Sequence, residues 1–140
     1  MSSSTRVAVI GAGPGGYAAA FLAADLGMQV TLVDEEKNPG GVCLYRGCIP
    51  SKALLHIAKL LDETKHAAAW GVEFGEPKVD INRLRSFKQG VVERLTAGTG
   101  QLARQRKITY LQGRATLTGP RTFTVALTAG GEQAVEVDYL

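Results

Sequence analysis

The sequence predicts one α/β domain, in which a parallel sheet with helices carries an appended antiparallel β-meander. Three observations predict it: a strand–helix–strand pattern near the start, two long helical patterns in the middle, and short alternating segments in the last third. A length of 140 residues allows one domain with a substantial core, so residues 1–140 are assigned to a single unit.

The first elements form a strand–helix–strand unit. Residues 6–10 (RVAVI) are a β-branched run typical of a buried strand, and residues 29–33 (QVTLV) form a second one that ends at Asp34. Between them, residues 15–26 are expected to form a helix of small side chains, which Gly27 terminates. Because such units have parallel strands and a right-handed crossover, the pattern indicates a parallel sheet.

Two longer helices are expected after a turn at residues 38–41. The first spans about residues 51–70 and the second residues 81–105, with Asp80 as its N-cap. We expect an apolar stripe on the second helix to face the core. Its members are Ile81, Leu84, Phe87, Val91, Leu95 and Leu102. Three glycines weaken this helix, so a break or a close packing contact is expected at Gly90, Gly98 or Gly100.

The last third of the chain changes to a two-residue period. Short strands are expected at residues 108–111, 116–117, 122–128 and 134–139. Gly130-Gly131 marks a hairpin turn before the last of them. These segments predict the β-meander.

The composition argues against nucleic acid and membranes as partners. The net charge is +3 with 6% aromatic residues, and the one dense basic cluster, residues 104–107, lies at a helix end. The uncharged run 7–24 contains four glycines and Pro14, which disfavour a spanning helix. Residues 1–5 supply no basic targeting segment, so a cytoplasmic protein is expected.

A glycine motif predicts a Rossmann-like dinucleotide site. Gly11, Gly13 and Gly16 match G-x-G-x-x-G directly after a strand and at the start of a helix. Gly11 permits the tight turn, Gly13 the approach of a pyrophosphate, and Gly16 close packing of the helix. The pyrophosphate would lie on the N–H groups of the helix start, where Pro14 and Gly15 are found.

The second strand supplies an acidic partner for this motif. Asp34 stands 23 residues after Gly11, where a carboxylate accepts hydrogen bonds from the adenosine ribose, and Glu35 is the alternative. The motif alone does not distinguish FAD from NAD.

Cys43 and Cys48 stand five residues apart, which in a cytosolic protein indicates redox chemistry or a metal. His56 and His66 show no zinc-type spacing to them, so no metal is expected. Residues five apart in an ideal α-helix have Cα atoms about 8.6 Å apart, whereas a disulfide needs roughly 4.4–6.8 Å. If the two cysteines pair, the segment between them is therefore not a regular helix; Gly47 supplies backbone freedom there.

Residues 40–52 (GGVCLYRGCIPSK) resemble the redox-disulfide signature of the flavoprotein reductases that include dihydrolipoamide dehydrogenases, glutathione reductases and mercuric reductases. Residues 48–54 (CIPSKAL) are most similar to the dihydrolipoamide dehydrogenases, and the resemblance covers essentially all 140 residues. It implies FAD as the bound cofactor, NAD as co-substrate, and a redox disulfide between Cys43 and Cys48.

The resemblance also implies a role for each residue. Cys43, as the more exposed thiol, would exchange with the dithiol substrate, and Cys48 would lie against the flavin and pass electrons to FAD. Lys52, one helical turn after Cys48, would face the same ring and favour its reduced, anionic form.

Further positions follow from the same resemblance. Backbone groups of Gly41 and Val42 would contact the cofactor, and Ala115 would lie near its adenine end. Tyr45 and Arg46, between the cysteines, border the substrate entrance or are simply exposed.

The implied partners are dihydrolipoamide on a lipoyl carrier domain, a second subunit in a homodimer, and a 2-oxo-acid dehydrogenase complex. The family commonly carries glutamate at the position of Asp34, a difference of one methylene. Its members are several times longer and contain an NAD-binding and a dimer-interface domain, so we expect a partial FAD-binding domain, incomplete at its C-terminus and inactive alone. A glutathione or mercuric reductase and a non-catalytic nucleotide-binding module with structural cysteines are the alternatives.

Overall fold

The computed structural model describes residues 4–140 and confirms the α/β fold. Residues 1–3, part of the segment expected to lack a targeting signal, lie outside the described residues. The elements are β1 (Arg6–Ile10), α1 (Pro14–Asp25), β2 (Gln29–Asp34), α2 (Gly41–Tyr45), α3 (Cys48–His66), the 3₁₀ helix η1 (Ala67–Trp70), α4 (Ile81–Gln105), β3 (Thr109–Leu117), β4 (Thr122–Leu127) and β5 (Glu132–Glu136).

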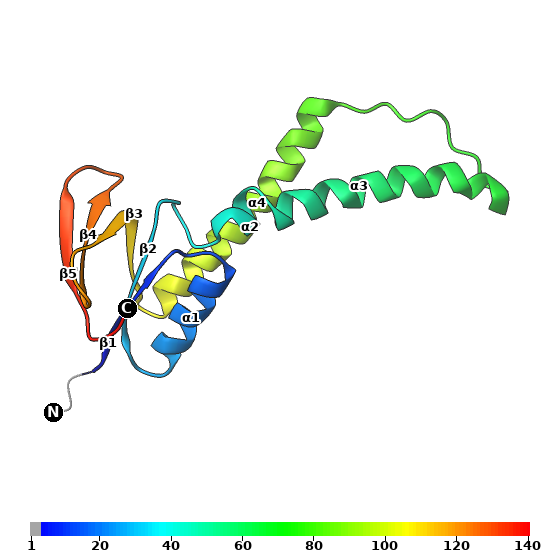
Figure 1. The fold of residues 1–140 in the computed structure, drawn as a ribbon. Helices are drawn as coiled ribbons and strands as arrows, with labels where there is room; N and C mark the ends of the chain where they lie inside the picture. Colours follow the sequence, from blue (N-terminus) through cyan, green and yellow to red (C-terminus); the bar gives the residue numbers. More distant parts are fainter. Residues whose placement is uncertain (1–3) are drawn as a thin grey trace.

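Within residues 4–140 the strands form one five-stranded sheet in the order β1-β2-β3-β4-β5. The first three strands are parallel, and β4 and β5 continue antiparallel as the predicted meander (Figure 1). The hairpin turn between β4 and β5 lies at Gly130 and Gly131, which have φ of +97° and +86°. This arrangement confirms the fold class and the predicted turn.

The prediction of two separate strands at residues 108–111 and 116–117 is wrong, because β3 is continuous. Its first half, Thr109 to Gln112, pairs with β2, and its second half, from Gly113, pairs with β4. A Cβ on Gly113 would lie 2.3 Å from the carbonyl oxygen of Ala126. The glycine that interrupts the sequence pattern is therefore required by the close pairing of the strands.

The last predicted strand also differs from the structure. β5 covers Glu132–Glu136, and the chain then turns to β1, where the N–H of Asp138 donates to the carbonyl oxygen of Arg6 at 2.9 Å. Tyr139 forms a parallel bridge with Val7. The end of the chain thus lies beside β1 rather than in the meander (Figure 1).

The parallel strands lie between two apolar clusters. On one face, α1 and the C-terminal half of α4 pack on β2, and this cluster comprises Ala12, Ala20, Val30, Leu32, Ala103 and Ile108. On the other face, the meander packs on β1 and β2, and its cluster comprises Ala8, Val33, Leu111, Phe123, Val125 and Val137. The domain therefore has three layers, with the parallel strands in the middle.

The helices begin and end close to the predicted residues. Helix α4 has the predicted bounds, and the carboxylate of Asp80 accepts hydrogen bonds from the N–H groups of Asn82 (2.9 Å) and Arg83 (3.0 Å). The helix is not broken at its glycines, and of the three only Gly100 makes a close contact. Helix α3 begins at Cys48, three residues earlier than predicted.

Helix α3, η1, residues 71–80 and the N-terminal half of α4 project from the layered part as an arm (Figure 1). The expectation that the apolar stripe of α4 faces the core is wrong, since Ile81, Phe87, Leu95 and Leu102 are each 42–52% exposed. The buried residues of α4 are instead Val92, Thr96, Gly100 and Ala103. Small side chains on that face let the helix approach closely, and because Thr96 and Gly100 are not apolar, the face shows no hydrophobic period.

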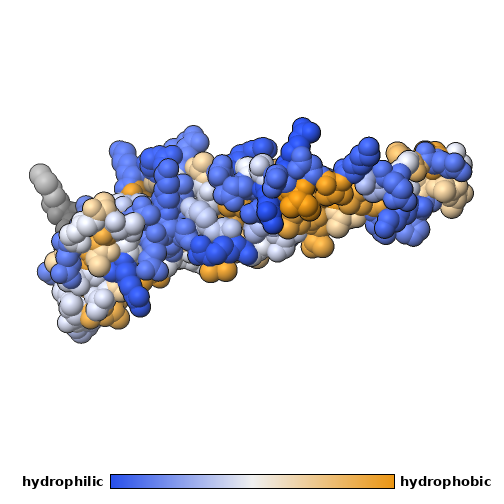
Figure 2. Space-filling view, turned by 90° about the horizontal axis from the view of Figure 1, so that it is seen from above, coloured by the Kyte–Doolittle hydropathy of each residue, from blue (hydrophilic) through white to orange (hydrophobic). Residues whose placement is uncertain are grey.

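Hydrophobic residues gather on part of the surface of the arm (Figure 2). The large exposed side chains of α3 include Leu54, Leu55 and Leu60. No helix within residues 4–140 combines the length and the apolar character that crossing a membrane requires.

We predict that Asp80→Ala lowers the free energy of unfolding by about 1 kcal/mol, because two N–H groups at the start of α4 lose their acceptor. Urea denaturation measures the effect. Glu73→Ala, an exposed change in residues 71–80, is the matched control. An equal loss in both variants would contradict the assigned cap.

Candidate functional site

The turn between β1 and α1 has the backbone geometry that the glycine motif predicts. Gly11 has φ of +95°, and its N–H donates to the carbonyl oxygen of Val33 at 2.8 Å. A Cβ on Gly16 would lie 1.8 Å from the carbonyl oxygen of Gly11, so only glycine fits there. At Gly13 and Gly15 an added Cβ would meet nothing within 4 Å. The turn therefore packs closely between Gly11 and Gly16, and it has open space beside Gly13 and Gly15, where α1 begins.

Helix α1 begins at Pro14 with Gly13 as N-cap, and among residues 4–140 no side chain caps it. The first N–H groups of a helix have no partner within the helix and favour negative charge. This uncapped, open helix start fits the pyrophosphate of a dinucleotide.

Asp34 links the end of β2 to the glycine turn. Its Oδ2 accepts a hydrogen bond from the N–H of Ala12 at 2.7 Å, and its Oδ1 accepts one from the N–H of Glu36 at 2.9 Å. Since an ionised carboxylate has about four acceptor positions, Asp34 retains capacity for a ribose hydroxyl.

A pocket of about 190 Å³ brings the predicted adenosine-side residues together. Gly11, Asp34, Glu35 and Ala115 all line it, although β3, which carries Ala115, follows about 75 residues after β2. The pairing of β3 with β2 creates this proximity, which no local sequence pattern indicates.

The cysteine segment lies directly on the glycine turn. Gly41 has φ of +57°, and a Cβ added to it would lie 2.6 Å from the Cα of Gly13. The N–H of Gly40 donates to the carbonyl oxygen of Ala12 at 2.7 Å. Val42 follows with 65% of its surface exposed. The two motifs recognised separately in the sequence therefore form one continuous site.

The segment between the cysteines is not a regular helix. Helix α2 ends at Tyr45 and α3 begins at Cys48, so residues 46–47 form a break. A Cβ on Gly47 would lie 3.1 Å from the carbonyl oxygen of Val42 and 3.4 Å from the Cα of Cys43. Glycine thus allows the start of α3 to approach Cys43 closely. Both cysteines are free in the structure, and the disulfide stays a prediction.

The expected order of exposure of the two thiols is wrong. Cys48 is exposed and Cys43 is half-buried, because α2 packs against α3 and α4 whereas Cys48 is the first residue of the projecting α3. A hydrogen bond with the Cys48 side chain raises the pKa of Cys43, and partial burial adds to this shift. The positive charge of Lys52 acts in the opposite direction and lowers the pKa of Cys43.

The sequence profile described as "Pyridine nucleotide-disulphide oxidoreductase" matches residues 5–140. The chain belongs to this family. Dihydrolipoyl dehydrogenase of Haemophilus influenzae is 46% identical over 134 residues, which are 96% of this chain and 28% of that protein. Dihydrolipoyl dehydrogenase of Halobacterium salinarum is 40% identical over 99% of this chain and 29% of its own length. Leghemoglobin reductase of Glycine max is 41% identical over 99% of this chain and 27% of its own length. The chain thus spans less than a third of these relatives.

In this member of the family, two of the four residues between the cysteines, Tyr45 and Arg46, contact the segment that follows β2. The hydroxyl of Tyr45 lies 3.1 Å from the N–H of Asn38, from which it accepts, and 3.2 Å from the carbonyl oxygen of Asn38, to which it donates. Arg46 forms an ion pair with Glu36 at 2.5 Å. Asn38 and Glu36 were not predicted as site residues, because a polar contact across a turn leaves no periodic signal.

Tyr110 of β3 completes the set of contacts around Glu36. Its hydroxyl donates to the carbonyl oxygen of Glu36 at 2.7 Å. Burial raises the pKa of Tyr110, and the negative charge of Asp34 adds to the shift, so the phenol keeps its proton throughout the physiological range.

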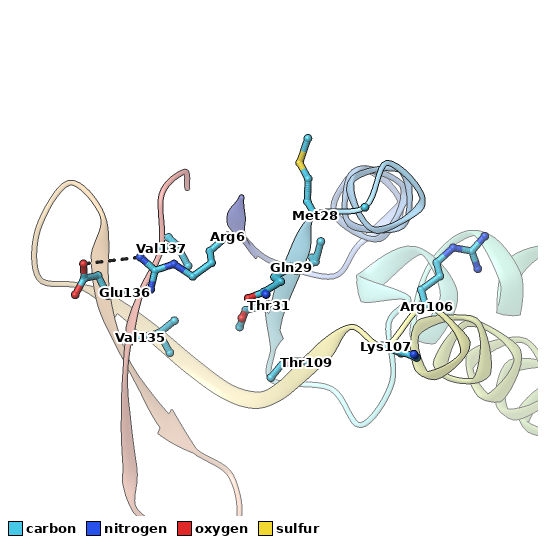
Figure 3. Close-up of a pocket in the computed structure, with 12 residues that line it drawn as sticks. Arg6, Met28, Gln29, Thr31, Arg106, Lys107, Thr109, Val135, Glu136 and Val137 are labelled. Carbon is cyan, nitrogen blue, oxygen red and sulfur yellow. Dashed lines mark ion pairs between the residues drawn. The ribbon is translucent and has the colours of Figure 1, made fainter. Parts of the chain in front are cut away.

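A separate cleft of about 420 Å³ lies at the opposite ends of the parallel strands (Figure 3). Two of its cations already have partners: Arg6 donates to Asp138 at 3.2 Å and Arg106 donates to Asp25 at 3.1 Å. Ligands of open parallel sheets bind beyond the carboxyl ends of the strands, where the glycine turn is found. The glycine turn, and not this cleft, is therefore the candidate cofactor site.

We predict that Gly16→Ala lowers the free energy of unfolding by about 1–3 kcal/mol, because the new Cβ overlaps the carbonyl oxygen of Gly11. Gly15→Ala is the matched control, since its Cβ meets open space and alanine favours the helix. Urea denaturation compares the two. Equal stability of both variants would contradict the described packing.

We predict opposite shifts of the Cys43 pKa in two variants. Cys48→Ala removes the side chain that raises this pKa, so the pH midpoint of Cys43 alkylation moves down and the reactive thiolate forms at lower pH. Lys52→Met removes the opposing positive charge, so the midpoint moves up. Mass spectrometry of the Cys43 peptide after iodoacetamide treatment measures both. Lys59→Met, further along α3, should leave the midpoint unchanged, and a shared direction in the first two variants would contradict the assignment.

Proposed function

We propose that this chain supplies the FAD-binding and redox-cysteine part of an NAD-dependent dihydrolipoamide dehydrogenase. The observation that carries the proposal is the contact of Gly41 with Gly13, which places the cysteine segment on the turn suited to a pyrophosphate. Relatives named dihydrolipoyl dehydrogenase at 40–46% identity support this substrate class.

In this proposal the chain binds FAD along the carboxyl ends of β1 and β2. The open helix start after Gly13, with Pro14 and Gly15, takes the pyrophosphate. Asp34 or Glu35 takes the adenosine ribose, and the pocket that reaches Ala115 takes the adenine side. When bound, FAD supplies a two-electron carrier between the cysteine pair and NAD.

The backbone of Gly41 and Val42 then borders the cofactor. Cys48 and Lys52, which are one turn apart on α3, face the cofactor from the same side of that helix. Cys48 stands at the start of a 19-residue helix, whose first N–H groups favour a negative charge. Lys52 adds a positive charge near the pair, as its effect on Cys43 indicates. These two features support a thiolate at the end of the exchange reaction.

The exchange reaction begins from a Cys43–Cys48 disulfide. One thiolate of dihydrolipoamide attacks Sγ of Cys43, the disulfide bond breaks, and Cys48 leaves as a thiolate. The second substrate thiol loses its proton and displaces Cys43, which takes up a proton. The substrate is then oxidised to its cyclic disulfide and the cysteine pair is reduced by two electrons. The assignment of Cys43 as the attacked sulfur rests on the family resemblance, because Cys48 is the more exposed thiol.

The partners of the whole protein are part of the same proposal. We propose that it forms a homodimer in the cytoplasm, takes dihydrolipoamide from a lipoyl carrier domain, and serves a 2-oxo-acid dehydrogenase complex. Because this chain spans 28% of the H. influenzae relative, we also propose that the 140 residues alone do not reduce NAD with dihydrolipoamide. Turnover of the isolated chain at the rate of the relatives would contradict that last point.

We predict that the full polypeptide carrying these residues is purified with FAD and reduces NAD with dihydrolipoamide. Cys43→Ser and Cys48→Ser each lower this activity to background, since neither leaves a disulfide to exchange. Spectrophotometry of NADH formation measures it, and Ser86→Ala, on the exposed part of α4, is the control with normal activity.

The alternatives separate in the same experiment. Glutathione disulfide and mercuric ion are offered with a reduced nicotinamide in parallel assays, and a preference for either would replace dihydrolipoamide as the substrate. A colourless protein that does not bind added FAD would leave a non-catalytic nucleotide-binding module.

A further inference from the structure

We propose that Tyr45 and Arg46 are positioning residues for the cysteine pair, because they hold the turn between the cysteines against the segment that follows β2. We call their contacts, Tyr45 with Asn38 and Arg46 with Glu36, the brace. This proposal rests on the proposed function and adds to it a determinant of the thiol–disulfide equilibrium.

In the Tyr45 half of the brace, Tyr45 contacts Asn38, a residue that is itself held in place by α4. The phenol hydroxyl engages both the N–H and the carbonyl oxygen of Asn38. Asn38 in turn lies against α4, where a Cβ on Gly100 would come 2.2 Å from the side-chain oxygen Oδ1 of Asn38. The hydroxyl of Thr99 donates to the carbonyl oxygen of the neighbouring Pro39. The anchor of Tyr45 therefore belongs to the packed part of the domain.

The Arg46 half acts on Glu36, whose backbone is held by two hydrogen bonds. The backbone N–H of Glu36 donates to Asp34, its carbonyl oxygen accepts from Tyr110, and its carboxylate pairs with Arg46. The Glu36 side chain is 23% exposed and that of Arg46 is 61% exposed. Because the Glu36 side chain is mostly buried, it has less freedom to lose in forming the pair, which favours this pair over an ordinary surface ion pair.

The brace acts where the cysteine segment has least support of its own. Residues 46–47 are the non-helical link between α2 and α3, and Gly47 has no side chain to hold it. On the α3 side, Ser51 secures this link through a hydrogen bond from its hydroxyl to the carbonyl oxygen of Gly47 at 2.7 Å. On the α2 side, Tyr45 and Arg46 do so.

A restrained link keeps the two sulfur atoms at a high effective concentration. Without the brace, the thiols sample larger separations while the disulfide still demands its narrow geometry. The equilibrium between the dithiol and the disulfide therefore moves toward the dithiol when the brace is lost.

The test is the thiol–disulfide equilibrium of the full polypeptide in glutathione buffers of defined ratio, quantified by alkylation and mass spectrometry of the Cys43–Cys48 peptide. Tyr45→Phe and Arg46→Gln should each lower the equilibrium constant for disulfide formation about two- to tenfold, the range expected for one hydrogen bond or ion pair. Tyr139→Phe and Arg85→Gln, which remove the same groups at exposed positions away from the cysteines, should leave it unchanged.

A charge exchange separates positioning from general stability. Arg46→Glu places two carboxylates together and should lower the constant, and adding Glu36→Arg should restore it to within about twofold by re-forming the pair in reverse. Melting temperatures measured in parallel should not follow this pattern.

An unchanged constant in Tyr45→Phe and Arg46→Gln, or a double variant no better than Arg46→Glu, would overturn the proposal. These outcomes differ from failure of the proposed function, in which the unaltered protein itself forms no Cys43–Cys48 disulfide or binds no FAD.

Discussion

The site depends on a backbone contact between two glycines. Gly41 lies so close to the Cα of Gly13 that a methyl group on it would come within 2.6 Å of that atom. The contact joins a turn suited to phosphate with a segment that carries two thiols, and a hydrogen bond between Gly40 and Ala12 lies beside it. A side chain at Gly41 would push the two segments apart. Glycine is therefore used here to bring two pieces of backbone together, and less for flexibility.

The features predicted from the sequence are those with a local cause. The glycine turn and the N-cap of α4 each depend on residues close together in the chain, and each has the expected geometry. The family likewise followed from a contiguous segment of 13 residues around the cysteines. The disulfide and the individual roles of the cofactor-binding residues are predictions that the geometry supports and does not test.

The features that were missed depend on contacts between distant segments. The buried face of α4 is formed by Val92, Thr96, Gly100 and Ala103, and Thr96 and Gly100 interrupt its hydrophobic pattern. The larger apolar residues of α4 suggested a core face that the structure leaves exposed. The contact of Tyr45 with Asn38 could not be predicted from the sequence either, because it depends on how a turn folds and turns have no periodic pattern.

Strand β3 belongs to both halves of the sheet, since its first residues pair with β2 and its later residues pair with β4. Without β3, both β2 and β4 would lose the strand that they pair with on that side. The two apolar layers on either side of the parallel strands are therefore linked through one continuous piece of backbone, and we expect them to melt as one cooperative unit. The projecting arm has few such links to the sheet, so amide exchange there should proceed through local openings that leave the layered part intact.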